Sequence, residues 1–284
     1  MADDAAPLPS ATRRVVARRH GPGGPAHQPA DEATGRETVA EETPVALVYN
    51  GHSFAVMMAS PVDLVDFALG FSLSEGVIER PDEFLAAEVV PHARGIELVL
   101  TIAEARALAL RARTRSLAGR TGCGLCGVDS IAEALRPVAR LAATTRLAAA
   151  AIDRAVAAFP ADQPLGHATG ATHAAAFADL DGVVRITRED VGRHNALDKL
   201  IGAVVAAGLD PAAGFVVVSS RCSYEMVHKT AAAGIPLIAS VSAPTGLAVD
   251  LAEKVGIGLA AYARDGRFTL YAGCDRIVDQ LKNS

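Results

Sequence analysis

The chain has 284 residues, enough for one large domain or two modest ones with a real hydrophobic core. Its formal net charge of -5 does not indicate nucleic-acid binding, and no apolar run approaches the roughly 20 residues that a membrane helix needs. Four cysteines in a chain of this length do not make a disulfide framework. The twin arginines of TRRVVARRH precede no apolar stretch of signal-peptide length, so we expect a cytoplasmic protein without a membrane anchor.

The first 40 residues are expected to form a disordered tail. Prolines concentrate there, as in GPGGPAHQP, and such a segment buries little apolar surface. We therefore divide the chain into this tail (1–40), a smaller N-terminal α+β part (41–115), a mobile cysteine loop (116–130) and a larger core (131–284).

The N-terminal part is expected to contain a hairpin, a helix and a strand. Asn50 and Gly51 lie between two β-rich runs and indicate a hairpin, because both residues of the favoured turn need positive φ. The next helix is expected to start at Ser60, which can cap it, with Pro61 in its first turn. The run IELVLTI (96–102) is typical of a strand, and AEARALALRAR after it is typical of a helix.

The C-terminal part alternates strands and helices. Helices are expected at 131–141, where Pro137 should break or kink the chain, and at 147–159. An Asp-Gly pair at 181–182 marks a second hairpin, and from there the order is strand, helix, strand, helix, strand, helix, strand. This order predicts an α/β fold with a layered mixed sheet and helices on its faces. Polar residues just past the strand ends of such a sheet gather at one edge.

Cys123 and Cys126 form a CxxC pair in the glycine-rich stretch RTGCGLCGVDS (120–130). The spacing leaves a metal, a disulfide and a sulfur carrier open. Structural zinc needs four ligands and a second CxxC is missing, whereas a thioredoxin-like disulfide usually lies near the start of a βαβ fold. A persulfide carrier fits a bendable glycine loop best, since the thiolate must meet other sulfur atoms. Cys222 and Cys274 are isolated and are expected to be small hydrophobic residues.

Two polar stretches lie at strand-to-helix junctions, EDVGRHNALDK (189–199) and SSRCSYEMVHK (219–229). Arginines, hydroxyl groups and free N–H groups at a helix start suit phosphate, although neither a Walker motif nor G-x-G-x-x-G is present. Asp190 can cap the first helix, and Glu225 and His228 are spaced to orient each other. The alternative is an ordinary capped helix with a solvated, charged face. The candidate phosphate ligands are Arg193, His194, Ser219 and Arg221.

Taken together, TGCGLCG, TGATHAAAF, EDVGRHNALDKLIG, SSRCSYEMVHKTAAAGIPLIASVSAPTGLAVDLAE and FTLYA resemble, in this order, the formate dehydrogenase accessory sulfurtransferase family (FdhD), from about residue 40 onward. The resemblance implies a cytidine-deaminase-like core and a homodimer. It implies that Cys123 takes sulfur as a persulfide from a cysteine desulfurase, with Cys126 as its partner. The sulfur then passes to molybdenum (or tungsten) in the bis(molybdopterin guanine dinucleotide) cofactor, a bound substrate, on its way to the formate dehydrogenase catalytic subunit. No permanent cofactor is expected.

The resemblance also implies a cofactor-binding stretch near the C-terminus, in which Ala272 stands where threonine is expected. Its residues are Phe268, Thr269, Leu270, Tyr271, Ala272 and Gly273. The deaminase-like fold does not imply deaminase chemistry, because H-x-E is missing and the CxxC pair follows Thr121-Gly122 instead of proline. No metal site is therefore expected. Two alternatives stay open: a cofactor-binding chaperone that moves no sulfur, and a zinc-binding deaminase-like protein.

Overall fold

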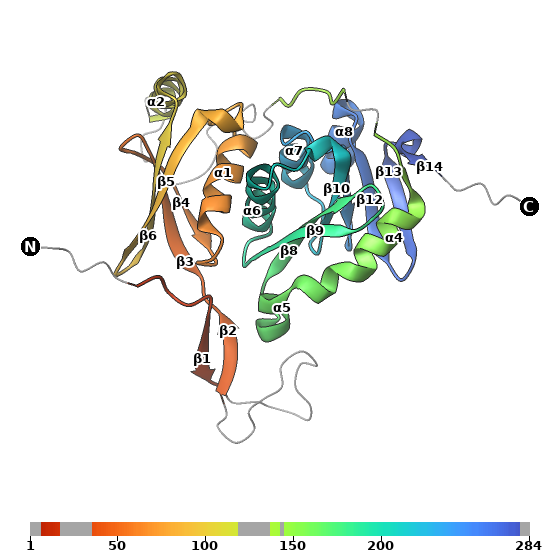
Figure 1. Cartoon of the computed structure of the whole chain (residues 1–284), viewed down its shortest axis with the longest axis horizontal. Coiled ribbons are helices and arrows are strands. Elements are labelled where there is room, and N and C mark those ends of the chain that lie inside the picture. The colour runs from red at the N-terminus through yellow and green to blue at the C-terminus, as the bar shows by residue number, and fades with distance from the viewer. Residues whose placement is uncertain (1–6, 18–35, 119–136, 143–144, 279–284) are drawn as a thin grey trace, which may run out of the picture.

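A computed structural model describes residues 7–17, 36–118, 137–142 and 145–278 (Figure 1). A two-stranded arm, a four-stranded sheet with its helices and a six-stranded sheet with helices on both faces follow one another along the chain. None of the helices in these ranges combines the length and the apolar character needed to cross a membrane. The predicted α/β class, with a mixed sheet covered by helices and a smaller N-terminal α+β part, is confirmed.

The N-terminal sheet has the strand order β4-β3-β6-β5, in which β3 and β6 run parallel and the outer pairs run antiparallel. Alternate residues of β3 and β6 are buried and pack against α1 and α2. The predicted hairpin is confirmed, with φ of 45° at Asn50 and 78° at Gly51 between β3 and β4. The elements are β3 (Thr43–Tyr49), β4 (His52–Ala59), α1 (Leu64–Ser74), β5 (Phe84–His92), β6 (Gly95–Ile102) and α2 (Glu104–Ala118).

The larger sheet has the strand order β13-β12-β11-β10-β8-β9. Its central strands β10, β11 and β12 are parallel, whereas β8, β9 and β13 join through antiparallel pairs. Its strands are β8 (His173–Asp179), β9 (Val184–Asp190), β10 (Gly214–Val218), β11 (Leu237–Ser240), β12 (Gly258–Arg264) and β13 (Arg267–Ala272). Its helices are α4 (Ala149–Ala158), α5 (Pro164–Thr169), α6 (Arg193–Ala206), α7 (Tyr224–Ala232) and α8 (Gly246–Val255).

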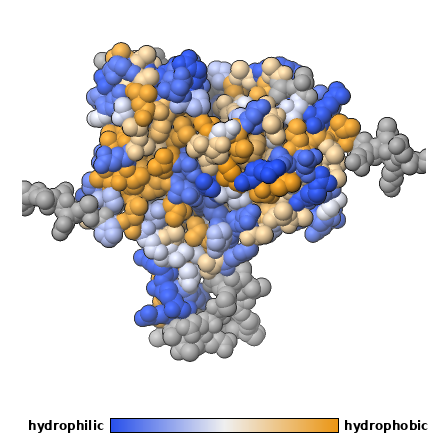
Figure 2. Space-filling model, viewed as in Figure 1, coloured by the Kyte–Doolittle hydropathy of each residue, from blue (hydrophilic) through white to orange (hydrophobic). Residues whose placement is uncertain are grey.

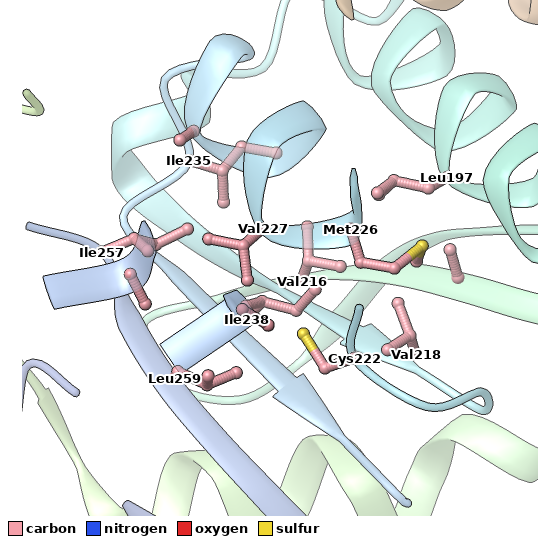
Figure 3. Packing of buried hydrophobic residues seen from close by; sticks show 14 of the residues in the cluster. Leu197, Val216, Val218, Cys222, Met226, Val227, Ile235, Ile238, Ile257 and Leu259 are labelled. Carbon is pink, nitrogen blue, oxygen red and sulfur yellow. The ribbon is translucent and has the colours of Figure 1, made fainter. Parts of the chain in front are cut away.

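The two faces of this sheet bury separate apolar clusters. One cluster joins alternate strand residues to α6, α7 and α8, and Figure 3 shows Val216, Ile238 and Leu259 pointing toward Met226 and Val227 of α7. The other cluster joins the remaining strand residues to α4. The period of two along a strand therefore sends neighbouring side chains into opposite layers, which is the expected behaviour of a sheet covered on both faces.

The two parts meet along α1 and α6. These helices pack closely because a glycine on each helix lies directly against the backbone of the other. A Cβ at Gly70 would overlap the carbonyl oxygen of Asp198, and a Cβ at Gly202 would overlap that of Asp66. Buried polar groups cross the same interface. Lys229 Nζ, for example, donates to both carboxylate oxygens of Asp198 at 3.0 Å and to Glu75 Oε1 at 2.8 Å.

Several expected elements differ from the structure. The segment 1–40 contains the antiparallel strands β1 (Thr12–Val16) and β2 (Arg36–Ala40), so these residues are not part of a disordered tail. Both strands contain β-branched valine and threonine, which favour extended backbone, and their ladder satisfies the backbone groups. The cysteine segment starts later than 116, because α2 continues through Ala118. Of the helix expected at 131–141, the described residues from 137 onward are irregular, as Pro137 favours.

Two strands, β5 and β12, lie where no strand was expected. β12 contains no β-branched residue, and β5 contains Pro91, which disfavours a strand, directly after its two valines. Short pairs complete the structure, with β7 (Leu147–Ala148) parallel to β14 (Ile277–Val278). Figure 2 shows hydrophobic residues gathered on the surface of the four-stranded part, and the arm below it is mostly hydrophilic.

Candidate functional site

The predicted carrier residues Cys123 and Cys126 lie outside the described residues, and so does most of the loop expected at 116–130. The remaining two cysteines can be compared directly. Cys222 is fully buried in the cluster beneath α7 (Figure 3), and burial raises the pKa of its thiol to about 12. Because the thiolate is the nucleophile, we expect Cys222 to be unreactive in the folded protein. Cys274 is exposed but follows β13 at the far end of the sheet.

The structure brings the predicted phosphate ligands together at one end of the strands of the larger sheet, which we call its carboxyl edge. β9, β10 and β11 all end at this edge, and β8 starts there, as the register of His173 with Asp190 shows. Arg193 and His194 follow β9, and Ser219 and Arg221 follow β10. We call this set, with His173, the carboxyl-edge cluster.

Ser219 holds this edge together. Its backbone N–H donates to the carbonyl oxygen of Ala174 at 3.0 Å, and its Oγ accepts from the backbone N–H of Ala174 at 2.9 Å. The serine therefore extends the β8–β10 pairing by one residue beyond the strand. Arg221, two residues later, is exposed and has no ion pair among the described residues. Its guanidinium is thus available to an external anion.

Arg193 and His194 begin α6, and Gly192 before them provides no side-chain cap. His194 Nε2 lies 2.7 Å from Glu225 Oε2, and this contact joins the first turns of α6 and α7 and lowers the pKa of Glu225. The predicted pairing of Glu225 with His228 is replaced by this contact between helices. The Nε of Arg193 is buried and has no partner among the described residues.

His173, which received little weight from sequence alone, lies beside these cations. Burial lowers its pKa, and the positive charges of Arg193 and His194 lower it further. The guanidinium of Arg193 and the first turn of α6 lie close to His173 and favour a bound anion, against the negative charge of Asp190 on the paired strand. In the sequence, His173 stands at the start of a strand. Only the antiparallel pairing of β8 with β9 brings the start of that strand to the same place as the ends of the other strands.

Other residues of the stretch EDVGRHNALDK (189–199) have structural roles. Asp190 does not cap α6 through its first turn; its carboxylate pairs with Lys199 at 2.7 Å, and both side chains are fully buried. Asp198 shares a helix face with His194 in principle, but it binds Ser74 and Lys229 at the interface with α1. The charged residues of this stretch thus have two different roles: some form buried ion pairs between elements, and the others lie at the start of α6 beside the candidate anion site.

The stretch Phe268–Gly273 forms the edge strand β13 and the residue after it. Phe268 and Leu270 pack toward α4, Ala272 is buried on the opposite side, and Thr269 is exposed. Because β13 is antiparallel to β12, it starts near the carboxyl-edge cluster and ends at the other edge of the sheet. The structure therefore does not bring all predicted cofactor residues to one place within the chain.

Gly273 lies at that other edge, with φ of 68°, and packs directly against Gly258. It lines a cavity of about 430 Å³ together with three arginines that the sequence did not single out. Of these, Arg276 is buried and donates to the carbonyl oxygens of Gly256 and Thr145. The other two are Arg140 and Arg146, both exposed.

Among the described residues, no group of three or more histidine, cysteine, aspartate or glutamate side chains is arranged to hold a metal ion. The acidic groups near the edge are already engaged. The carboxylate of Glu189, for instance, accepts from the backbone N–H groups of Leu165 and Gly166 at 2.8 and 2.7 Å. The described part of the site is therefore suited to anions by its free cations and helix N-termini.

Comparison with known proteins agrees with this architecture. The model of the FdhD/NarQ family matches residues 40–278, which include both cysteines of the CxxC pair. The "Sulfur carrier protein FdhD" of Bordetella petrii is 50% identical over 245 residues, covering 86% of this chain and 88% of that protein. The protein of the same name from Chromobacterium violaceum is 53% identical over 238 residues, covering 83% and 88%.

A solved structure shares the fold. It is the crystal structure of a protein from Desulfotalea psychrophila described as a formate dehydrogenase accessory protein, with a TM-score of 0.68 and 28% identity. The match covers 86% of this chain and 92% of that one. With its α/β fold, its CxxC pair and these matches, the chain belongs to the FdhD/NarQ family.

Proposed function

We propose that this protein is a cytoplasmic sulfur carrier in formate dehydrogenase maturation. It takes sulfur as a persulfide from a cysteine desulfurase and passes it to the molybdenum bis(molybdopterin guanine dinucleotide) cofactor. The observation that carries the proposal is the sequence identity of at least 50% with relatives named sulfur carrier proteins. This similarity extends over more than four fifths of both chains. The burial of Cys222 supports it further, because that cysteine is removed from the candidates and the CxxC pair is favoured.

Loading is a thiol exchange that needs no oxidant. The thiolate of Cys123 attacks the outer sulfur of the donor persulfide, the donor S–S bond breaks, and the donor leaves as a thiolate. Cys123 then carries one additional sulfur atom. The rate of such an exchange rises with the thiolate fraction of the attacking cysteine and with the acidity of the leaving thiol.

Release of the sulfur as sulfide requires two electrons, and the CxxC pair can supply them. The thiolate of Cys126 attacks the inner sulfur of the Cys123 persulfide, so the terminal sulfur leaves as sulfide toward the metal of the cofactor substrate. The two cysteines end as a disulfide, which a dithiol reductant converts back to thiols. In this scheme Cys123 is the carrier and Cys126 the resolving thiol.

The carboxyl-edge cluster gives the anionic cofactor a place to bind. Arg193, His173 and Arg221 offer positive or donor groups, and the first turns of α6 and α7 add backbone N–H groups. Phosphates of the guanine dinucleotide are the groups that match this chemistry. The formate dehydrogenase catalytic subunit is then the destination of the sulfurated cofactor, and the carrier acts as a homodimer, which light scattering after size exclusion would test.

The decisive experiment is mass spectrometry of the protein after incubation with a cysteine desulfurase and free cysteine. We expect one added sulfur atom on the peptide that contains Cys123. The adduct should disappear in Cys123→Ala and should persist in Cys274→Ala, a matched control because Cys274 is the exposed cysteine outside the pair. Absence of any adduct on the wild-type loop peptide would rule out the carrier mechanism.

A cofactor-binding chaperone is the second candidate, because the cations of the carboxyl-edge cluster suit an anion whether or not sulfur is transferred. The double variant Cys123→Ala with Cys126→Ala separates the two functions in cells. Normal formate dehydrogenase activity in that background would favour the chaperone. Loss of activity, with cofactor binding retained by the purified variant, would favour the sulfur carrier.

A further inference from the structure

Tyr262 has an unusual backbone conformation for an aromatic residue. Its φ is 53°, in the left-handed region that bulky side chains rarely adopt. The residue lies in β12 where the register with β13 shifts between Ala261 and Arg264, so the strand carries a bulge at this point. Its N–H donates to the carbonyl oxygen of Ser242, two residues beyond the end of β11, at 3.1 Å.

The bulge turns the ring of Tyr262 outward. Its neighbours Ala261 and Ala263 are buried, yet Tyr262 is 43% exposed. A glycine would adopt the same backbone without strain. Bulges that re-aim a side chain, and strained non-glycine residues, concentrate near binding sites. The ring is held in solvent at the expense of local backbone energy, which suggests a role in binding.

The position of Tyr262 connects the two parts of the proposed cofactor site. Ser242 follows the end of β11, so Tyr262 lies at the same edge as the carboxyl-edge cluster. Its neighbour Ala261 pairs with Thr269 in the predicted cofactor stretch. Tyr262 lies near the end of β12 and Arg221 follows β10, and one strand separates β12 from β10, so the two backbones are about 9–10 Å apart across the sheet, within the span of a nucleotide from its base to its phosphates.

We propose that Tyr262 stacks on the guanine base of the bound cofactor, while the carboxyl-edge cluster holds the phosphates. The proposal rests on the proposed function, since the guanine dinucleotide is the substrate named there. Stacking suits an exposed phenol ring, because every nucleobase presents a flat π-face to it. The role is binding and positioning, and Tyr262 takes no part in the sulfur exchange.

Titration calorimetry with GDP and with inorganic pyrophosphate tests this assignment on the purified full chain. In Tyr262→Gly the dissociation constant for GDP should rise at least about fivefold, the lower end for losing one base–aromatic stack. The dissociation constant for pyrophosphate should stay unchanged. Tyr262→Phe keeps the ring and should bind GDP like the wild type.

Asp265→Gly is the matched control, because Asp265 has a φ of 54° in the turn of the same hairpin. Both glycine variants relieve backbone strain, so neither should lower the melting temperature, but only Tyr262→Gly should weaken GDP binding. Unchanged GDP affinity in Tyr262→Gly, or an equal loss of GDP and pyrophosphate affinity, overturns the stacking role alone. Failure of the wild type to bind GDP overturns the cofactor proposal together with it.

Discussion

Removing the positive charge of Lys199 should destabilise the protein strongly. Its ammonium group lies 2.7 Å from Asp190 Oδ2, and both side chains are fully buried. It also donates to the carbonyl oxygen of Ser60 at 2.9 Å, in the connection between β4 and α1. The pair therefore links the two parts of the molecule, and Lys199→Met leaves a buried carboxylate without its counter-ion.

The structure sets the expected size of the effect. Breaking a buried ion pair by removing one partner costs about 3–5 kcal/mol. Asp190 keeps three N–H donors after the substitution, from the backbone of Ser60 and Gly192 and from the amide of Asn195. These donors still stabilise the carboxylate, so we expect a loss near the lower end, about 3 kcal/mol. That is a large share of the roughly 5–15 kcal/mol by which domains are stable.

Urea unfolding followed by circular dichroism measures this loss. The double variant Asp190→Asn with Lys199→Met buries no charge and should be more stable than the sum of the single variants predicts. Arg185→Met is the control, because its pair with Asp179 is partly exposed and should contribute at most about 1 kcal/mol. A loss below 1 kcal/mol for Lys199→Met, or strict additivity in the double variant, would refute the reasoning.

Three further predictions concern packing, thiol reactivity and the edge of the sheet. Gly70→Ala should destabilise the protein by about 1–3 kcal/mol or more in urea unfolding, because a Cβ there meets the backbone of α6, whereas Gly246→Ala, with open space around it, should be neutral. Cys222 should react with Ellman's reagent only after unfolding; labelling of the native thiol at pH 8 would contradict its burial and its raised pKa of about 12. Arg193→Gln should raise the pKa of His173 in an NMR titration, since one positive neighbour is removed. The pKa of His173 in the folded protein is below its usual 6.5. The free energy that the unprotonated His173 contributes to folding is therefore present above pH 6.5 and is lost as the pH falls through the lowered pKa. An unchanged pKa of His173 in Arg193→Gln would show that the two side chains do not interact.

Local signals in the sequence were sufficient for much of the fold. The Asn50–Gly51 and Asp181–Gly182 turns, the apolar strands and the strand-helix alternation all depend on neighbouring residues, and the structure has them. Local signals also failed at identifiable places. The alanine-rich strand β12 has weak β propensity, and its pairing with β11 and β13 holds it in the sheet. The helix expected to start at Ser60 begins at Leu64, because Ser60 is engaged by Asp190 and Lys199 from the other part of the chain.

The sequence by itself determined the family, since the CxxC pair and the motifs at the strand-to-helix junctions are contiguous stretches that can be recognised without the tertiary structure. Only the tertiary structure decided which charged residues face outward. In the sequence, nothing distinguishes the charged residues Asp190, Asp198 and Lys199 from their neighbours Arg193 and His194. The packing of α1 on α6 buries the first three and leaves the other two at the carboxyl edge of the sheet. A helix of 3.6 residues per turn sends adjacent residues to different faces, and which face meets another element is set by residues more than a hundred positions away.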